Sequence, residues 1–76
     1  DMYDVPDEAE KKEDYQNLLS ALETLPEKYR DVISLRYFED HSFSEIGEML
    51  DITEGNAKVI NHRALAQLKE ELEQYE

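Results

Sequence analysis

The chain has 76 residues, no cysteine and a formal net charge of −12. This length allows one domain that buries only about 60% of the surface exposed in its unfolded chain. Without thiols, neither disulfides nor thiolate metal ligands can stabilise it, so helix packing must do so. Its apolar runs fall far short of the roughly 18 residues of a membrane span, and no signal segment opens the chain. We therefore expect a soluble, cytoplasmic domain without a metal or other cofactor.

The charge is distributed unevenly. Residues 55–69, GNAKVINHRALAQLK, contain Lys58, Arg63 and Lys69 and no acid, whereas the rest of the chain holds all 20 acidic residues. The net charge is opposite in sign to the positive charge expected of a nucleic-acid-binding protein. One locally positive segment nevertheless lies within this acidic molecule.

The first part of the chain divides into a linker and two helices. Residues 1–12 mix acids with Pro6 and lack an apolar period, which is typical of a solvated, flexible linker. From about Glu13, helical spacing of four leucines predicts an amphipathic helix closed by Pro26: Leu18, Leu19, Leu22 and Leu25. A second helix should start at Pro26 and run to about Glu39. Its predicted apolar face consists of Tyr29, Val32, Ile33 and Tyr37.

Capping residues predict two further helices. Ser42 and Glu45 have the spacing of a capping box, which indicates a short third helix that ends before Asp51. Thr53 is suited to be the N-cap of a fourth helix, with Glu54 near the positive end of its dipole. The inward face of that helix should be formed by Ala57, Ile60, Ala64, Leu68 and Leu72. Residues 13–76 are thus predicted to form an all-α domain of three to four helices.

The short connection between the last two helices favours a helix-turn-helix over some other small helical bundle. Gly47 is small where the helices should cross, and Asp51 tolerates the left-handed backbone that this turn commonly needs. Ile52 can fill the core from the turn. Asn61 lies beside the inward stripe, where it either caps a neighbour or marks the edge of the core.

The outward face of the fourth helix carries the candidate base contacts, namely Lys58, Val59, His62 and Arg63. Lysine and arginine can donate to guanine N7 and O6, histidine can donate or accept at a base edge, and valine can touch the thymine methyl. The alternative is that Lys58 and Arg63 are simply solvated. Neither His62 nor His41 has partners at metal-ligand spacing, so we expect no metal site.

Candidate contacts to the DNA backbone lie at the starts of the two helices and on the second helix, because helix N-termini and polar side chains bind phosphates. They are Arg36, Ser42, Ser44, Thr53 and Asn56, and Arg30 offers further charge.

Residues 25–72, LPEKYRDVISLRYFEDHSFSEIGEMLDITEGNAKVINHRALAQLKEEL, resemble region 4 of bacterial sigma factors, most closely those of the extracytoplasmic-function (ECF) group. The specific parts of the match are Leu25-Pro26 with Tyr29-Arg30, Leu35 to Phe38, Ser44 to Gly47 with Leu50, Asn56 to Lys58, and His62 to Ala64. The resemblance implies a domain that docks on the β-flap of RNA polymerase and recognises the upstream (−35) promoter element with its last helix. It also implies that the acidic stretch to about Asp14 ends the linker from region 2, and that an anti-sigma factor is a regulatory partner.

The chain departs from the family at Ile60, Leu65, Ala66 and Gln67, where further arginines or lysines are common. We therefore expect weak DNA binding by the isolated domain, with polymerase raising its effective concentration at the promoter. The alternative is a sigma-like interaction module with weak or lost DNA binding, whose acidic surface meets a basic partner. The output domain of a response regulator is a further alternative, although Leu25-Pro26-Glu27 favours sigma. We expect a monomer that is not an enzyme, since the sequence contains no phosphate loop or activated nucleophile.

Overall fold

The computed structural model describes residues 8–75, with side chains from residue 13 onward. The elements are α1 (Glu8–Thr24), α2 (Glu27–Ile33), the π-helical turn η2 (Ser34–Phe38), α3 (Phe43–Leu50) and α4 (Glu54–Glu73). Residues 8–75 contain no strand, which confirms the predicted all-α class. Among these helices, none combines the length and apolar character needed to cross a membrane.

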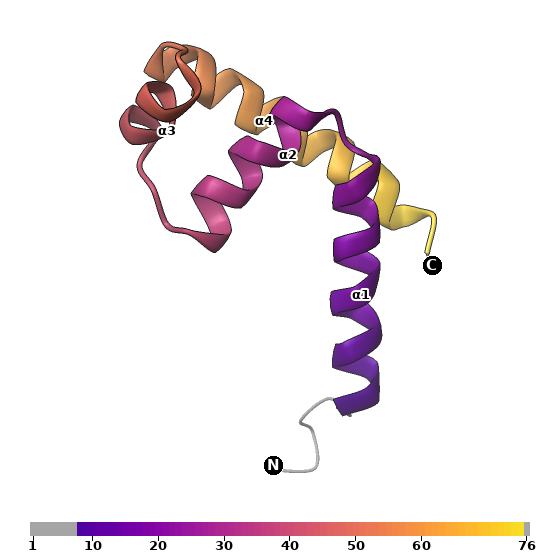
Figure 1. Cartoon of the computed structure of the whole chain (residues 1–76). Coiled ribbons are helices and arrows are strands. Elements are labelled where there is room, and N and C mark those ends of the chain that lie inside the picture. The colour runs from indigo at the N-terminus through magenta and orange to yellow at the C-terminus, as the bar shows by residue number, and fades with distance from the viewer. Residues whose placement is uncertain (1–7, 76) are drawn as a thin grey trace, which may run out of the picture.

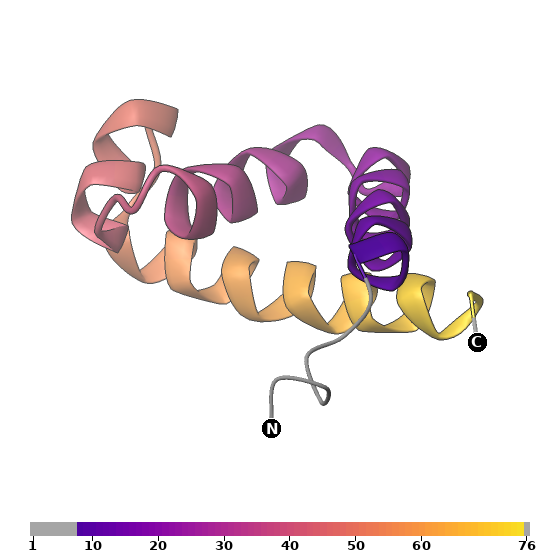
Figure 2. The same cartoon turned by 90° about the horizontal axis from the view of Figure 1, so that it is seen from below.

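Helix α4 contacts each of the other three α-helices. It runs along one side of the molecule, and α3, α2 with η2, and α1 lie against it in that order from its N-terminal end (Figure 2). The N-terminal part of α1 projects away from the other helices (Figure 1). Helices α1 and α3 therefore contact α4 at opposite ends.

Helix α1 begins at Glu8, five residues before the predicted start near Glu13. Residues 8–12, EAEKK, are strong helix formers and need no apolar period to extend a helix that is packed further along. The predicted linker therefore overlaps the helix over residues 8–12, and its residues 1–7 lie outside the described part. The helix ends at Thr24, as expected from Pro26, because the residue before a proline disfavours the helical conformation.

The second helix changes its winding partway. It is α-helical only to Ile33 and continues as a π-helix to Phe38, instead of running as one α-helix to about Glu39. The Glu39 N–H bonds to Ser34 O at 3.0 Å, the i+5 spacing of a π-turn. Asp40 then adopts a left-handed conformation with φ 61°, and His41 N–H reaches Leu35 O at 2.9 Å. This wider turn ends the helix and directs the chain toward α3.

The predicted caps of α3 and α4 are both present. Ser42 Oγ accepts from Glu45 N–H at 3.0 Å and Glu45 Oε1 accepts from Ser42 N–H at 2.8 Å, which completes the capping box. Thr53 Oγ1 accepts from Asn56 N–H at 3.0 Å and caps α4. These bonds satisfy N–H groups that no helical carbonyl can reach and so fix where each helix starts.

Two apolar clusters hold the helices together. One joins α1, α2 and the second half of α4 through Ala21, Leu22, Leu25, Ile33, Ala64 and Leu68. The other joins α2, α3 and the first half of α4 through Val32, Ile46, Ala57 and Ile60. Tyr29 packs against both clusters, so it links the two halves of the core. The predicted inward face of α4 is buried from Ala57 to Leu68 and becomes half-buried at Leu72.

Candidate nucleic-acid interface

The turn between α3 and α4 is held tightly. Asp51 has the predicted left-handed conformation, φ 58° and ψ 48°, and Ile52 N–H bonds to Gly47 O at 2.9 Å. A Cβ placed on Gly47 would lie 2.7 Å from Ile52 O and 3.3 Å from Glu54 N, so only glycine fits without displacing backbone. Ile52 packs against the second cluster, as predicted. The turn therefore fixes the direction of α4 relative to α3.

The four predicted base-contacting residues all lie exposed on α4, opposite its buried face. Lys58, His62 and Arg63 are exposed, and Val59 is 44% exposed. Lys58 Nζ lies 3.4 Å from Glu54 Oε2, one turn earlier on the helix. That carboxylate partly offsets the charge of Lys58, so the positive face of α4 begins with an ion pair. No such pairing was anticipated from the sequence, although the i,i+4 spacing is a known signal for it.

The helix starts provide further polar groups beside this face. In α3 and α4 the N–H groups of the first two residues have no partner within the helix, since the caps engage the third. The predicted backbone-contact residues Ser42, Ser44, Thr53 and Asn56 are all exposed there. The hydroxyls of Ser42 and Thr53 accept hydrogen bonds from the backbone, which leaves their own hydrogens available to a phosphate.

Arg36, the fifth residue predicted to contact the DNA backbone, makes contacts within the chain itself. Its guanidinium lies 4.5 Å from the centre of the Phe43 ring, and its Nη1 donates to His41 O at 3.0 Å. The side chain is half-buried. Arg36 therefore fastens the loop before α3 through a cation–π contact and a hydrogen bond.

The sequence left the role of Asn61 open, and the structure places it in the core. It is 9% exposed, and its Nδ2 donates to Tyr37 Oη at 3.1 Å, across 24 residues of sequence. Tyr37 belongs to η2 and is 51% exposed, so its ring is not part of the core that the apolar pattern predicted. The π-turn places this hydroxyl against α4, which no local pattern indicates.

One titratable group beside the interface is perturbed. The Ser42 N–H hydrogen bond lowers the pKa of Glu45 below its ordinary value of 4.5, with a smaller effect from the nearby His41. His41 Nδ1 lies 3.6 Å from Glu45 Oε1, and its Nε2 lies 3.9 Å from Glu39 Oε1. The start of α3 therefore combines a helix cap with a histidine flanked by two carboxylates.

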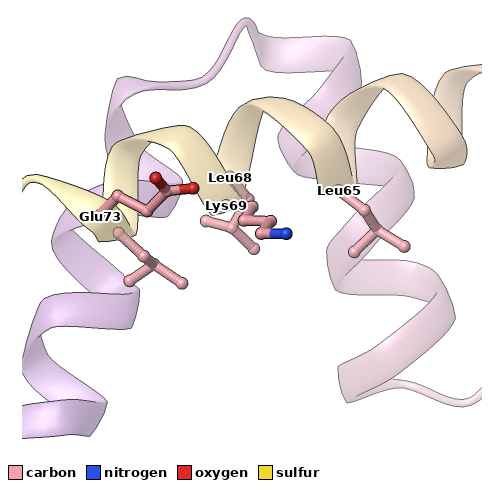
Figure 3. Close-up of a pocket in the computed structure, with 5 residues that line it drawn as sticks. Leu65, Leu68, Lys69 and Glu73 are labelled. Atoms are coloured by element: carbon pink, nitrogen blue, oxygen red, sulfur yellow. The ribbon is translucent and has the colours of Figure 1, made fainter.

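A shallow apolar hollow lies on the C-terminal half of α4, away from the base-contacting residues. Its volume is about 530 Å³, and its lining residues are Leu65, Leu68, Lys69, Leu72 and Glu73. Figure 3 shows these side chains on one face of α4, between α1 and the second helix. Leu65 remains 38% exposed there. The domain thus has a polar face and an apolar hollow at opposite ends of the same helix.

A short helix and a long helix joined by a tight turn, with polar side chains exposed on the second, define a helix-turn-helix domain. Residues 21–70 match the family model of sigma-70, region 4. The chain belongs to this family and is of the ECF type, which confirms the resemblance noted in its sequence.

Known proteins agree with this assignment. The chain is 41% identical to RNA polymerase sigma-E factor of Streptomyces antibioticus over 69 residues, 91% of this chain and 38% of that protein. It is 46% identical to ECF RNA polymerase sigma factor SigW of Bacillus subtilis over 48 residues, 63% and 26% of the two chains. It is 33% identical to RNA polymerase sigma factor FliA of Escherichia coli K12 over 57 residues, 75% and 24%.

The chain spans less than half the length of each of these relatives. No solved structure matches it significantly.

Proposed function

We propose that this domain recognises the −35 promoter element through the outward face of α4 and docks on the β-flap of RNA polymerase during transcription initiation. The observation that carries the first part is the joint exposure of Lys58, Val59, His62 and Arg63 on one face of a helix that a rigid turn presents. These side chains offer donors for guanine and adenine edges and a methyl contact for thymine. Promoter DNA and polymerase are therefore the proposed partners.

Contacts to phosphates would fix the domain on the duplex. The free N–H groups at the starts of α3 and α4, with Ser42, Ser44, Thr53 and Asn56, are the proposed donors. Arg36 is proposed to act mainly by holding the loop before α3. Because these groups are few and mostly neutral, we expect weak binding, with a salt dependence that comes mainly from Lys58 and Arg63.

The apolar hollow on α4 supports the proposed docking on polymerase. Three leucines line this hollow, so an apolar segment of the polymerase is the occupant that we propose for it. We expect Leu65→Glu to weaken association of the chain with the polymerase core while leaving DNA binding intact. Met49→Glu is a matched control, since Met49 is also exposed but lies outside the hollow. An equal loss in both variants would contradict docking at the hollow.

Selection of bound sequences from a random duplex pool at low salt tests promoter recognition. We expect the chain to enrich a defined sequence and the Lys58→Ala/Arg63→Ala variant to lose it, because each base contact contributes about 1–3 kcal/mol of discrimination. A Lys28→Ala/Lys69→Ala variant removes the same charge elsewhere and should retain the enriched sequence.

The strongly acidic composition favours one alternative, an interaction module that meets a basic partner. Under that hypothesis none of the three proteins enriches a sequence, and the Lys58→Ala/Arg63→Ala variant retains partner binding. The same selection experiment therefore decides between the two functions. An anti-sigma factor remains a proposed regulatory partner for the apolar surfaces of α1, α2 and α4, and a monomer remains the proposed state.

A further inference from the structure

Asn61 is a buried carboxamide in an otherwise apolar stripe. It lies between Ala57 and Ala64, both fully buried, and within the described part of the chain no donor reaches its Oδ1. A buried carbonyl oxygen without a donor destabilises a protein, and an apolar side chain of similar shape would avoid that loss. Core stability therefore does not explain an asparagine here, so its single hydrogen bond calls for another explanation.

That hydrogen bond ends on a hydroxyl with unused capacity. Tyr37 Oη accepts from Asn61 Nδ2 at 3.1 Å, and this is its only hydrogen bond to the described residues. A phenol that accepts a bond keeps its own hydrogen for donation, and accepting polarises the O–H group toward a stronger donor. Because Tyr37 is 51% exposed, an acceptor from another molecule can approach it.

The hydroxyl lies at the border of the base-contacting face. Asn61 is one turn after Lys58, and residues at this i,i+3 spacing are neighbours on a helix surface, so the hydroxyl bonded to Asn61 lies on the flank of α4 next to Lys58. Ile60, on the other side of the buried stripe, packs toward Ile46 of α3. Helix α4 is thus bordered by α3 on one flank and by η2 on the other.

A helix that enters the major groove is flanked by the phosphates that line the groove, and most protein contacts to DNA are made to them. We infer that the Tyr37 hydroxyl donates a hydrogen bond to a DNA phosphate on the η2 flank of α4, and that Asn61 positions it. This inference rests on the proposed function. Tyr37 is then a DNA-binding residue, and Asn61 is a positioning residue that acts through it.

A single-atom change tests the donor. Tyr37→Phe removes the hydroxyl and should lower the affinity of the full chain for its enriched duplex roughly ten-fold or more, because hydrogen bonds to charged groups are the strong ones. The same loss is expected on every duplex, since a phosphate contact carries no base preference. Tyr15→Phe, the same change on exposed Tyr15 of α1, should bind like the unchanged chain.

Neutral methylphosphonate groups placed singly along the duplex locate the acceptor. One position should weaken binding of the unchanged chain and have no effect on Tyr37→Phe. Asn61→Leu then tests positioning: it should raise the urea midpoint by removing the unpaired Oδ1 and yet weaken DNA binding. If the hydrogen bond were purely structural, a variant with a higher urea midpoint would not also bind DNA more weakly.

The outcomes are distinguishable. Equal DNA affinities of Tyr37→Phe and the unchanged chain, while Lys58→Ala/Arg63→Ala loses binding, would overturn the inference and leave the proposed function standing. Unchanged affinity in Asn61→Leu would overturn the positioning role. Absence of any enriched duplex for the unchanged chain would overturn both the inference and the proposed function.

Discussion

Substitution of Gly47 by alanine should destabilise the domain, because the added methyl group has no space. The ideal Cβ position is 2.7 Å from Ile52 O and 3.3 Å from both Glu54 N and Thr53 C. All three atoms belong to the backbone of the turn, and Ile52 N–H is itself bonded to Gly47 O. The turn therefore cannot move away from the methyl without losing that bond or shifting the start of α4.

The magnitude follows from two opposing effects. Alanine gains about 1 kcal/mol over glycine in a helix interior. Overpacking that displaces backbone costs roughly 1–3 kcal/mol and occasionally more. We expect the net free energy of unfolding to fall by up to about 2 kcal/mol, out of roughly 4–11 kcal/mol for a domain of this size. The corresponding drop in Tm is about 4–8 °C for each kcal/mol.

Urea unfolding followed by far-UV circular dichroism measures this difference, with an unchanged m-value as the check on two-state behaviour. The chain offers a matched control in Gly55, because a Cβ there meets no atom within 4 Å. Gly55→Ala, in the first turn of α4, should therefore be neutral or stabilising by up to about 1 kcal/mol. A Gly47→Ala variant that is as stable as Gly55→Ala would refute the steric argument.

Two further predictions concern charged groups at the helix starts. Glu54→Gln releases Lys58 from its ion pair, and since exposed pairs contribute about 0.2–1 kcal/mol, DNA affinity measured by fluorescence anisotropy should rise up to roughly five-fold at low salt. The gain should shrink as salt is added, and equal affinities at low salt would contradict it. The pKa of Glu45 is lower in the folded chain than its ordinary value of 4.5. Ionised Glu45 therefore stabilises the fold at pH values above 4.5, and this contribution is lost as the pH falls through the folded pKa. Urea midpoints between about pH 6 and pH 3 should therefore fall more steeply for the unchanged chain than for Glu45→Gln, and parallel curves would contradict this.

The features that the sequence predicts well depend on residues close together in the chain. The capping box of Ser42 and Glu45 spans three residues, and the Thr53 cap does the same. The left-handed Asp51 and the small Gly47 follow from the geometry of one turn. Such local chemistry allowed the position of α4, and with it the exposed face that carries the candidate site, to be predicted.

The features that the sequence does not predict depend on contacts between distant segments. The π-turn η2 has no periodicity distinguishable from an α-helix over five residues, so the second helix was expected to continue unchanged. The contact of Tyr37 with Asn61 crosses 24 residues and exists only because η2 and α4 pack together. Arg36 illustrates the same point, since its engagement with Phe43 and His41 O depends on the loop conformation that follows η2.

The acidic composition and the proposed DNA contact are compatible because charges act locally. Counterions screen exposed charges beyond about 8 Å at physiological salt, and from Gly55 to Gln67 helix α4 carries two bases, Lys58 and Arg63, and no acid. The acid nearest to this face on α4, Glu54, already pairs with Lys58. Glu45 and Asp51 lie beside the proposed phosphate contacts and oppose them locally, whereas most other acids lie on other elements and slow the approach to DNA rather than block contact. The proposed docking on polymerase would compensate for a slow approach by raising the effective concentration at the promoter. An acidic domain with one basic helix face is therefore suited to bind DNA as part of a larger assembly rather than alone.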